Sequence, residues 1–236
     1  MPPVPPRRDD DDPTTMVMNI DEVRIDPAVA AGWHPVVIHT DRGDVECRYW
    51  AVPESRRGVV WVGGAGDGWG SPAGGMVPDL AEALRDDSGI ASLQVRYRRA
   101  LSLEESIMDT LAGAAFLESE GVEAVGLVGH SLGGAVVIQA AAADPAVRTV
   151  VALATQSYGT DPVEDLGPRC SILLLHGAAD RVLPSACSQQ VHDWAAEPKR
   201  LVVYPDTDHN LDEAAEDVRR TVREWLAGEL SRAVVE

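Results

Sequence analysis

The sequence has little lysine, cysteine or net positive charge. Lys199 is its only lysine among 236 residues, and the formal net charge is −18. A surface this acidic repels phosphate backbones and anionic lipid headgroups, so we expect no nucleic-acid or membrane partner. The three cysteines are an odd number and match no metal-ligand spacing, which argues against a disulfide framework or a metal site. We therefore expect a protein of the reducing cytoplasm.

Long apolar runs are also missing from the chain. No stretch approaches the ~18 consecutive apolar residues that cross a bilayer. Residues 1–15 hold prolines, two arginines and four aspartates but no apolar core, which predicts a disordered tail and not a secretory signal. Residues 16–236 are predicted to form a single domain, since 45% hydrophobic and 25% charged residues are typical of soluble globular proteins.

What the chain does contain is a regular alternation of short apolar runs with longer segments of helical period. Residues 22–53 show β-branched, alternating patterns around a turn at 41–44, which predicts an antiparallel opening. From residue 58 onward the apolar runs resemble parallel strands that are buried on both faces. The order predicts a doubly wound, mostly parallel α/β sheet with antiparallel first strands. The later runs are 58–66, 90–97, 124–130, 148–156, 171–177 and 200–206, and the helical segments are 76–87, 103–121, 132–145, 185–198 and 211–230.

The stretch GLVGHSLGG, residues 126–134, lies between an expected strand and an expected helix. Gly129 to Gly133 fits the pattern G-x-S-x-G, the nucleophile elbow. A strand that reverses directly into a helix holds Ser131 in a strained turn of positive φ, where flanking side chains would collide. The helix N-terminus also favours developing negative charge at the serine. The alternative is a glycine-rich turn with an incidental serine.

An acid and a base follow two later strands. Asp180 and His209 each lie just beyond the carboxyl end of an expected strand, where functional residues of such sheets gather. The order Ser131, Asp180, His209 is the nucleophile, acid and base order of α/β-hydrolases. In this arrangement His209 takes the serine proton and Asp180 orients the imidazole. Asp161, which follows the preceding strand, is the alternative acid.

From about residue 58 to residue 230 the chain resembles the α/β-hydrolase superfamily. The elbow GHSLGG, the acid segment HGAADRVLP and the histidine segment DTDHNLDE occur in the family's order. The chain looks most similar to small, lid-poor enzymes akin to dienelactone hydrolase, although those carry a cysteine where this chain has Ser131. The resemblance implies a serine hydrolase of small carboxylic esters, lactones or thioesters, acting through an acyl-enzyme without metal or organic cofactor. A small peptidase or amidase, or a non-catalytic binding protein of the same fold, is the alternative.

The resemblance also implies an oxyanion hole formed by backbone N–H groups. Its expected donors are Ala65 and Leu132. Because Gly63 replaces the family's usual histidine, Gly64 stays open as the alternative to Ala65.

The remaining expectations concern the substrate pocket. Trp69, Met76 and Tyr158 lie near three of the loops and are candidate pocket walls, with a place in the core as the alternative. The chain between residues 154 and 168 is too short for a cap domain, which predicts an open pocket for a small ester-like substrate. The sequence carries no indication of oligomeric state.

Other polar residues have structural interpretations. Arg96, Arg98 and Arg99 are expected to pair with the protein's own acids, although a substrate carboxylate is the alternative partner. His130 is expected to pack or line the pocket, and His176 is expected to be structural.

Overall fold

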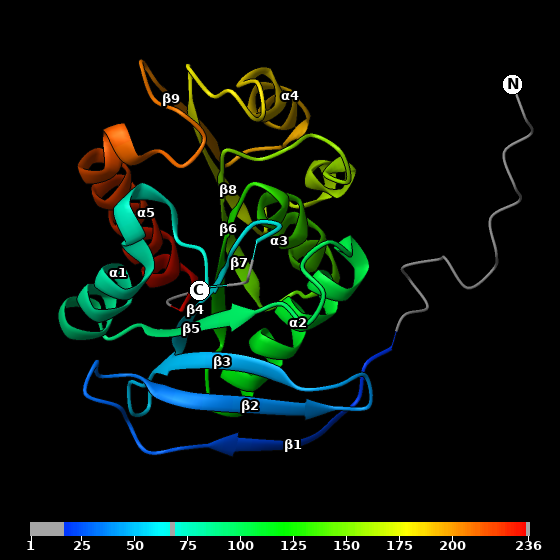
Figure 1. Ribbon diagram of the computed structural model, residues 1–236, viewed down its shortest axis with the longest axis vertical. Coiled ribbons are helices and arrows are strands. Elements are labelled where there is room, and N and C mark those ends of the chain that lie inside the picture. The colour runs from blue at the N-terminus through cyan, green and yellow to red at the C-terminus, as the bar shows by residue number, and fades with distance from the viewer. Residues whose placement is uncertain (1–16, 67–68, 235–236) are drawn as a thin grey trace, which may run out of the picture.

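The protein, seen in a computed structural model that describes residues 17–66 and 69–234, is built on one nine-stranded sheet (Figure 1). The strand order is β1-β2-β3-β5-β4-β6-β7-β8-β9. The tail expected at residues 1–15 lies outside the described residues.

The sheet is antiparallel at its beginning and parallel afterwards. The antiparallel strands are β1 (Ile20–Ile25), β2 (His34–Thr40) and β3 (Val45–Trp50), and β3 pairs with β5 in the same sense. The parallel strands are β4 (Arg57–Val62), β5 (Ala91–Arg96), β6 (Ala124–His130), β7 (Val147–Leu153), β8 (Ser171–Gly177) and β9 (Lys199–Tyr204). This confirms the predicted fold class.

Helices cover both faces of the sheet (Figure 1). One face is covered by α1 (Pro72–Ser88) and α5 (Ala215–Ala233). The other face carries α2 (Leu103–Ser119), α3 (Leu132–Ala143) and α4 (Ala186–Trp194). Because both faces are covered, a central strand such as β8 is buried along its whole length, which explains its continuous apolar run.

Short 3₁₀ helices complete the described chain. Residues 154–170, between β7 and β8, contain η3 (Asp161–Asp165) as their one regular element, so this connection holds no cap domain. A second 3₁₀ helix, η4 (Asp212–Ala214), precedes α5. In the described part of the chain, no helix has the length and apolar character needed to cross a membrane.

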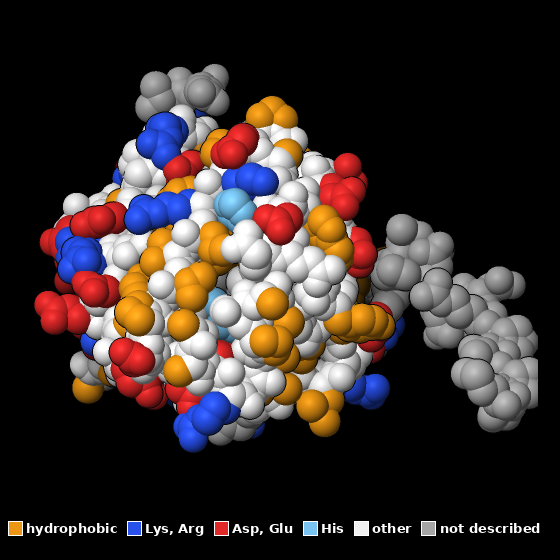
Figure 2. Space-filling model, turned by 90° about the horizontal axis from the view of Figure 1, so that it is seen from above, with side chains coloured by type: hydrophobic (Ala, Val, Ile, Leu, Met, Phe, Trp, Pro, Cys, Tyr) orange, Lys and Arg blue, Asp and Glu red, His pale blue; other side chains and the backbone are white. Residues whose placement is uncertain are grey.

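The surface reflects the acidic composition. Seen from above, apolar side chains gather toward the middle of the face, and most acidic side chains lie around its rim (Figure 2).

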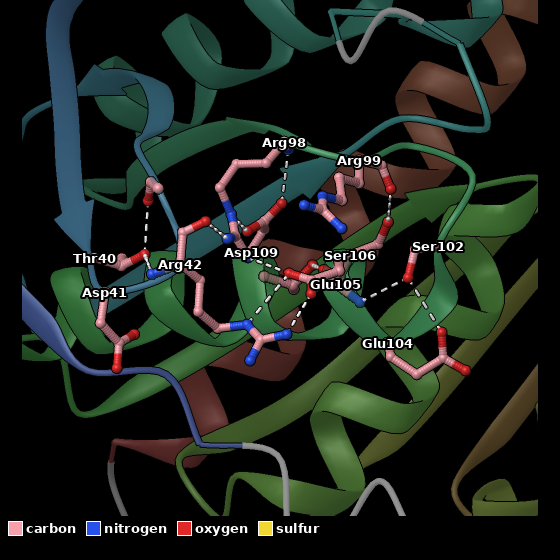
Figure 3. A network of polar contacts seen from close by, with 12 residues as sticks. Thr40, Asp41, Arg42, Arg98, Arg99, Ser102, Glu104, Glu105, Ser106 and Asp109 are labelled. Carbon is pink, nitrogen blue, oxygen red and sulfur yellow. Dashed lines mark hydrogen bonds and ion pairs between the residues drawn. The ribbon is translucent and has the colours of Figure 1, made fainter. Parts of the chain in front are cut away.

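A buried ionic network joins the β2–β3 turn to α2 (Figure 3). The backbone N–H of Arg98 donates to Asp109 Oδ2 (2.8 Å), and its guanidinium contacts both Asp109 and Glu105. Arg42, in the turn, also donates to Glu105. The Asp109 side chain is fully buried, and those of Arg98 and Glu105 are nearly so.

This network answers the question of the basic cluster. Arg98 pairs with acids of the protein itself, and Arg96 does the same with Glu46 (2.8 Å). The structural interpretation is confirmed for these two arginines. The Arg99 side chain is exposed, and the Arg99 carbonyl accepts from Ser106 Oγ (3.5 Å).

Candidate active site

Ser131 occupies a sharp turn between β6 and α3. Its φ and ψ are 56° and −117°, and such a positive φ is uncommon for a residue with a side chain. The Ser131 N–H donates to the Leu153 carbonyl of β7 (2.8 Å), and the Ser131 carbonyl accepts from the N–H of Gly134 (3.0 Å). The strand–turn–helix context predicted around the serine is therefore present.

Close backbone contacts explain the glycines on either side of the serine. A Cβ atom on Gly129 would lie 2.1 Å from the Gly133 carbonyl oxygen. A Cβ atom on Gly133 would lie 2.3 Å from the Gly63 carbonyl oxygen. Only glycine permits these approaches. The second contact also places the segment after β4 directly against the elbow.

Asp180 lies in the turn after β8, and its side chain is fully buried. Oδ1 accepts from the N–H groups of Val182 (2.7 Å) and Leu183 (2.8 Å), and Oδ2 lies 2.7 Å from His209 Nδ1. Burial raises the pKa of Asp180, but the hydrogen bonds from His209 and the two amides outweigh it, so the pKa lies below its ordinary value. An ionised carboxylate therefore faces His209.

His209 lies in the loop after β9, and its side chain is 14% exposed. Since Nδ1 faces a carboxylate, this nitrogen carries the proton and Nε2 is left as an acceptor. The backbone N–H of His209 donates to Asp208 Oδ1 (2.8 Å), and Asp208 is held by the Arg181 guanidinium. The imidazole is thus presented in the tautomer of a general base.

His130 links the elbow to the histidine loop. The ring centroids of His130 and His209 are 4.8 Å apart, and His130 Nε2 lies 3.0 Å from the His209 carbonyl oxygen. Burial lowers the pKa of His130 to about 4, so a neutral ring donates this hydrogen bond. Because His130 precedes Ser131, the contact brings the elbow against His209.

Two backbone segments border Ser131, the segment after β4 and the start of α3. A Cβ atom on Gly64 would lie 3.3 Å from Ser131 Cβ, so the segment that carries Gly64 and Ala65 packs against the serine. Leu132 is the first residue of α3, and the first N–H groups of a helix have no acceptor within it. The expected oxyanion donors therefore lie in segments that border the serine.

The alternative acid lies apart from this arrangement. Asp161 is exposed at the first position of η3, whereas Asp180 contacts His209. The geometry thus favours Asp180 over Asp161 as the acid.

The three expected pocket walls have different surroundings. Met76 is fully buried among the residues between α1 and the sheet, which corrects its placement in a pocket wall and makes it a core residue. Tyr158 is 80% exposed in the segment after β7. The ring of Trp69 stacks under the Arg48 guanidinium, 4.1 Å from its centroid, which ties the segment after β4 to β3.

A hollow of about 480 Å³ opens beside His209. Its charged lining is mostly acidic, because three carboxylates oppose one guanidinium there. The other lining residues are Arg181, Val182, Asp208, Asn210, Asp212 and Glu213. Across residues 17–66 and 69–234, no three His, Cys, Asp or Glu side chains come together in a way that could hold a metal ion.

Sequence comparisons place the chain among known proteins. The profile described as "Dienelactone hydrolase family" matches residues 79–227. The uncharacterized protein YfhR of Escherichia coli K12 is 30% identical over 135 residues, which cover 53% of this chain and 45% of YfhR. The chain thus spans less than half the length of the curated relatives it matches.

Solved structures share the fold at low identity. Est1E from Butyrivibrio proteoclasticus has a TM-score of 0.70 at 17% identity, over 84% of this chain and 99% of that chain. A dienelactone hydrolase from Anabaena variabilis has a TM-score of 0.70 at 20% identity, over 84% and 98% of the two chains. The esterase domain of a Rhodothermus marinus protein has a TM-score of 0.63 at 18% identity, over 91% and 100%. All three likenesses concern the fold alone.

Proposed function

Because the chain belongs to the dienelactone hydrolase family, we propose that it is a hydrolase of the carboxylic-ester type that cleaves small esters through an acyl-enzyme on Ser131. The observation that carries this proposal is the 2.7 Å contact between Asp180 Oδ2 and His209 Nδ1 beside the serine elbow. Lactones and thioesters present the same acyl carbonyl and belong to the same substrate class.

The reaction follows from the roles of these groups. His209 Nε2 takes the proton of Ser131 as the hydroxyl oxygen attacks the acyl carbonyl, and Asp180 stabilises the imidazolium that forms. The N–H groups of Leu132 and of Ala65 or Gly64 donate to the oxyanion. Collapse of the tetrahedral intermediate expels the alcohol, which takes the proton from His209. Water, with His209 again as base, then releases the acid and restores Ser131.

The surroundings of the serine support a small substrate. The segment between β7 and β8 holds one 3₁₀ helix, so little covers the site from that side. Tyr158 and Trp69 are the aromatic residues that we place at its border. An acidic hollow beside His209 favours neutral substrates over anionic ones.

The proposal places the enzyme in the cytoplasm. Cys47, Cys170 and Cys187 are free thiols, which is the state that a reducing compartment maintains. An ester-like small molecule is its proposed partner.

The test is hydrolysis of p-nitrophenyl esters of increasing acyl length, with the matching p-nitroanilides. We expect short-chain esters to be hydrolysed, and the Ser131→Ala variant to lose about 10⁴-fold or more in kcat. The Ser157→Ala variant is the matched control and should keep its activity. A fluorophosphonate probe should label the wild type and the control only. A Ser131→Ala protein as fast as the wild type would contradict the proposal, and anilides cleaved as fast as esters would favour the amidase alternative.

A further inference from the structure

His176, the residue before the last of β8, is fully buried beside the acid of the site. Its Nε2 lies 3.1 Å from Asp180 Oδ2 and 3.1 Å from the Leu183 carbonyl oxygen. Its Nδ1 lies 2.6 Å from Ser188 Oγ of α4. Both ring nitrogens therefore have polar neighbours.

These neighbours decide which nitrogen carries the proton. The carboxylate and the carbonyl at Nε2 only accept hydrogen bonds, so Nε2 is protonated, and the Ser188 hydroxyl donates to Nδ1. Burial lowers the pKa of His176, and the titratable groups whose charges act on it are Asp180 and His209. The ring is thus neutral, with its Nε2 proton between two oxygens.

Leu183 closes a small frame around the carboxylate. Its N–H donates to Asp180 Oδ1 (2.8 Å), while its carbonyl accepts from His176 Nε2. Oδ1 is therefore fixed by the turn, and Oδ2 lies between His176 and His209. His176 supports both the turn and the oxygen that orients the imidazole.

We propose that His176 is a positioning residue, whose Nε2–H is shared between Asp180 Oδ2 and the Leu183 carbonyl and fixes the carboxylate against His209. This inference rests on the proposed serine mechanism, in which His176 acts only through Asp180. Without this donor Oδ1 stays fixed by the turn, but Oδ2 is held by His209 alone, so the orientation of the imidazole is less well defined. Such a loss lowers kcat and leaves KM nearly unchanged, because ground-state binding does not involve the imidazole orientation.

Two substitutions of His176 test the contributions of its two ring nitrogens separately. Glutamine carries its amide nitrogen at the same bond separation from Cα as Nε2, and asparagine carries it at that of Nδ1. His176→Gln thus keeps a donor toward Asp180 and Leu183, whereas His176→Asn keeps only a partner for Ser188. Both replace a buried imidazole with a primary amide, so they are matched in polarity.

With a short-chain ester, we expect His176→Gln to keep kcat within about threefold of the wild type. His176→Asn should lose about 10- to 100-fold in kcat, the range seen when groups that orient metal ligands are removed. Titration with a fluorophosphonate counts the competent sites, and the thermal midpoint records any loss of stability. If His176 acted in folding alone, the kcat values of the two variants would fall by similar amounts, together with their thermal midpoints.

Equal kcat values for the two variants, or a loss confined to KM, would overturn the inference. An active Ser131→Ala protein would contradict the proposed function itself. The comparison of the two His176 variants tests only the positioning role, so the two failures can be told apart. A measurement on the wild type covers the case in which neither variant folds. The ¹⁵N spectrum of the histidines should show His176 as the neutral Nε2–H tautomer near neutral pH, and a protonated Nδ1 would overturn the inference.

Discussion

At the scale of single residues, burial and hydrogen bonds give three neighbouring histidines different tasks. His209 has its Nδ1 against Asp180, which leaves Nε2 for the proposed role of base, and His176 has its Nε2 against the same carboxylate. His130 donates to the His209 carbonyl with a ring that burial keeps neutral. The side-chain type is the same in each case, so the task follows from the neighbours of each ring nitrogen.

The neutral state of His130 predicts a pH dependence of stability. In the unfolded chain an imidazole takes a proton at about pH 6.5, whereas burial lowers the His130 pKa to about 4. The free energy of unfolding should therefore fall as the pH drops from about 6.5 to about 4, by at most about 3 kcal/mol from this group. Urea denaturation across this range measures the fall.

The matched variant for this prediction is His130→Gln. It keeps a donor for the His209 carbonyl but does not titrate, so its stability should fall less over the same interval. His176 contributes in the same direction and remains in both proteins. If the free energy of unfolding had the same pH dependence in the two proteins, the attribution of this fall to His130 would be wrong.

The sequence indicates some of these residues and conceals others. Asp180 and His209 are predictable because each follows an apolar run, and strand ends meet at one edge of a parallel sheet. His176 lies inside such a run. The pattern there indicates only that the residue is buried, and it does not indicate a contact with Asp180. Met76 begins a segment of helical period, and the periodicity does not tell which of its side chains reach a pocket.

At the scale of elements, the elbow depends on the contact between Gly133 and Gly63. We expect Gly133→Ala to lose about 1–3 kcal/mol in the free energy of unfolding, because its Cβ would lie 2.3 Å from a carbonyl oxygen. We also expect kcat to fall, since the displaced segment carries a proposed oxyanion donor. Thermal unfolding and ester hydrolysis measure the two effects.

The control is Gly228→Ala in α5, where the nearest atom to a new Cβ is the end of the Arg232 side chain at 3.9 Å. This change should leave stability unchanged or raise it by up to about 1 kcal/mol, because alanine favours the helix. Equal effects at the two glycines would argue against a tight elbow.

Element boundaries show where the sequence pattern stops being informative. The parallel strands are predictable because their continuous apolar runs match burial on both faces. The element α1 spans Pro72–Ser88, whereas the helical period predicts 76–87. Ala73, Gly74 and Gly75 have φ of 53°, 66° and 79°, which is not right-handed helical backbone, so the regular helix starts after them, as the period predicts.

At the scale of the whole molecule, the network around Asp109 joins distant parts of the chain. We expect Asp109→Ala to cost about 3–5 kcal/mol, because it leaves the Arg98 guanidinium buried without its main partner. Arg56→Ala, which breaks an exposed pair with Glu123, should cost less than about 1 kcal/mol. Chemical denaturation compares the two variants, and similar losses would contradict a buried network.

This network also marks a limit of the sequence analysis. Arg42 and Glu105 are 63 positions apart, and nothing in the pattern of either segment names the other. The arginine cluster is visible in the sequence, but its partners depend on how the sheet brings the β2–β3 turn to α2. That residues 16–236 form a single domain stays a prediction, supported by one sheet that runs from β1 to β9.

The positive φ of Ser131 bears on how this chemistry can evolve. The strain of the turn is set by the backbone and the neighbouring glycines, and the atom beyond Cβ does not enter into it. A thiol in place of the hydroxyl would therefore meet the same turn, the same imidazole and the same helix end. The proposed nucleophile can therefore be exchanged at this position by one replacement, whereas a nucleophile one residue away would lie outside this positive-φ turn.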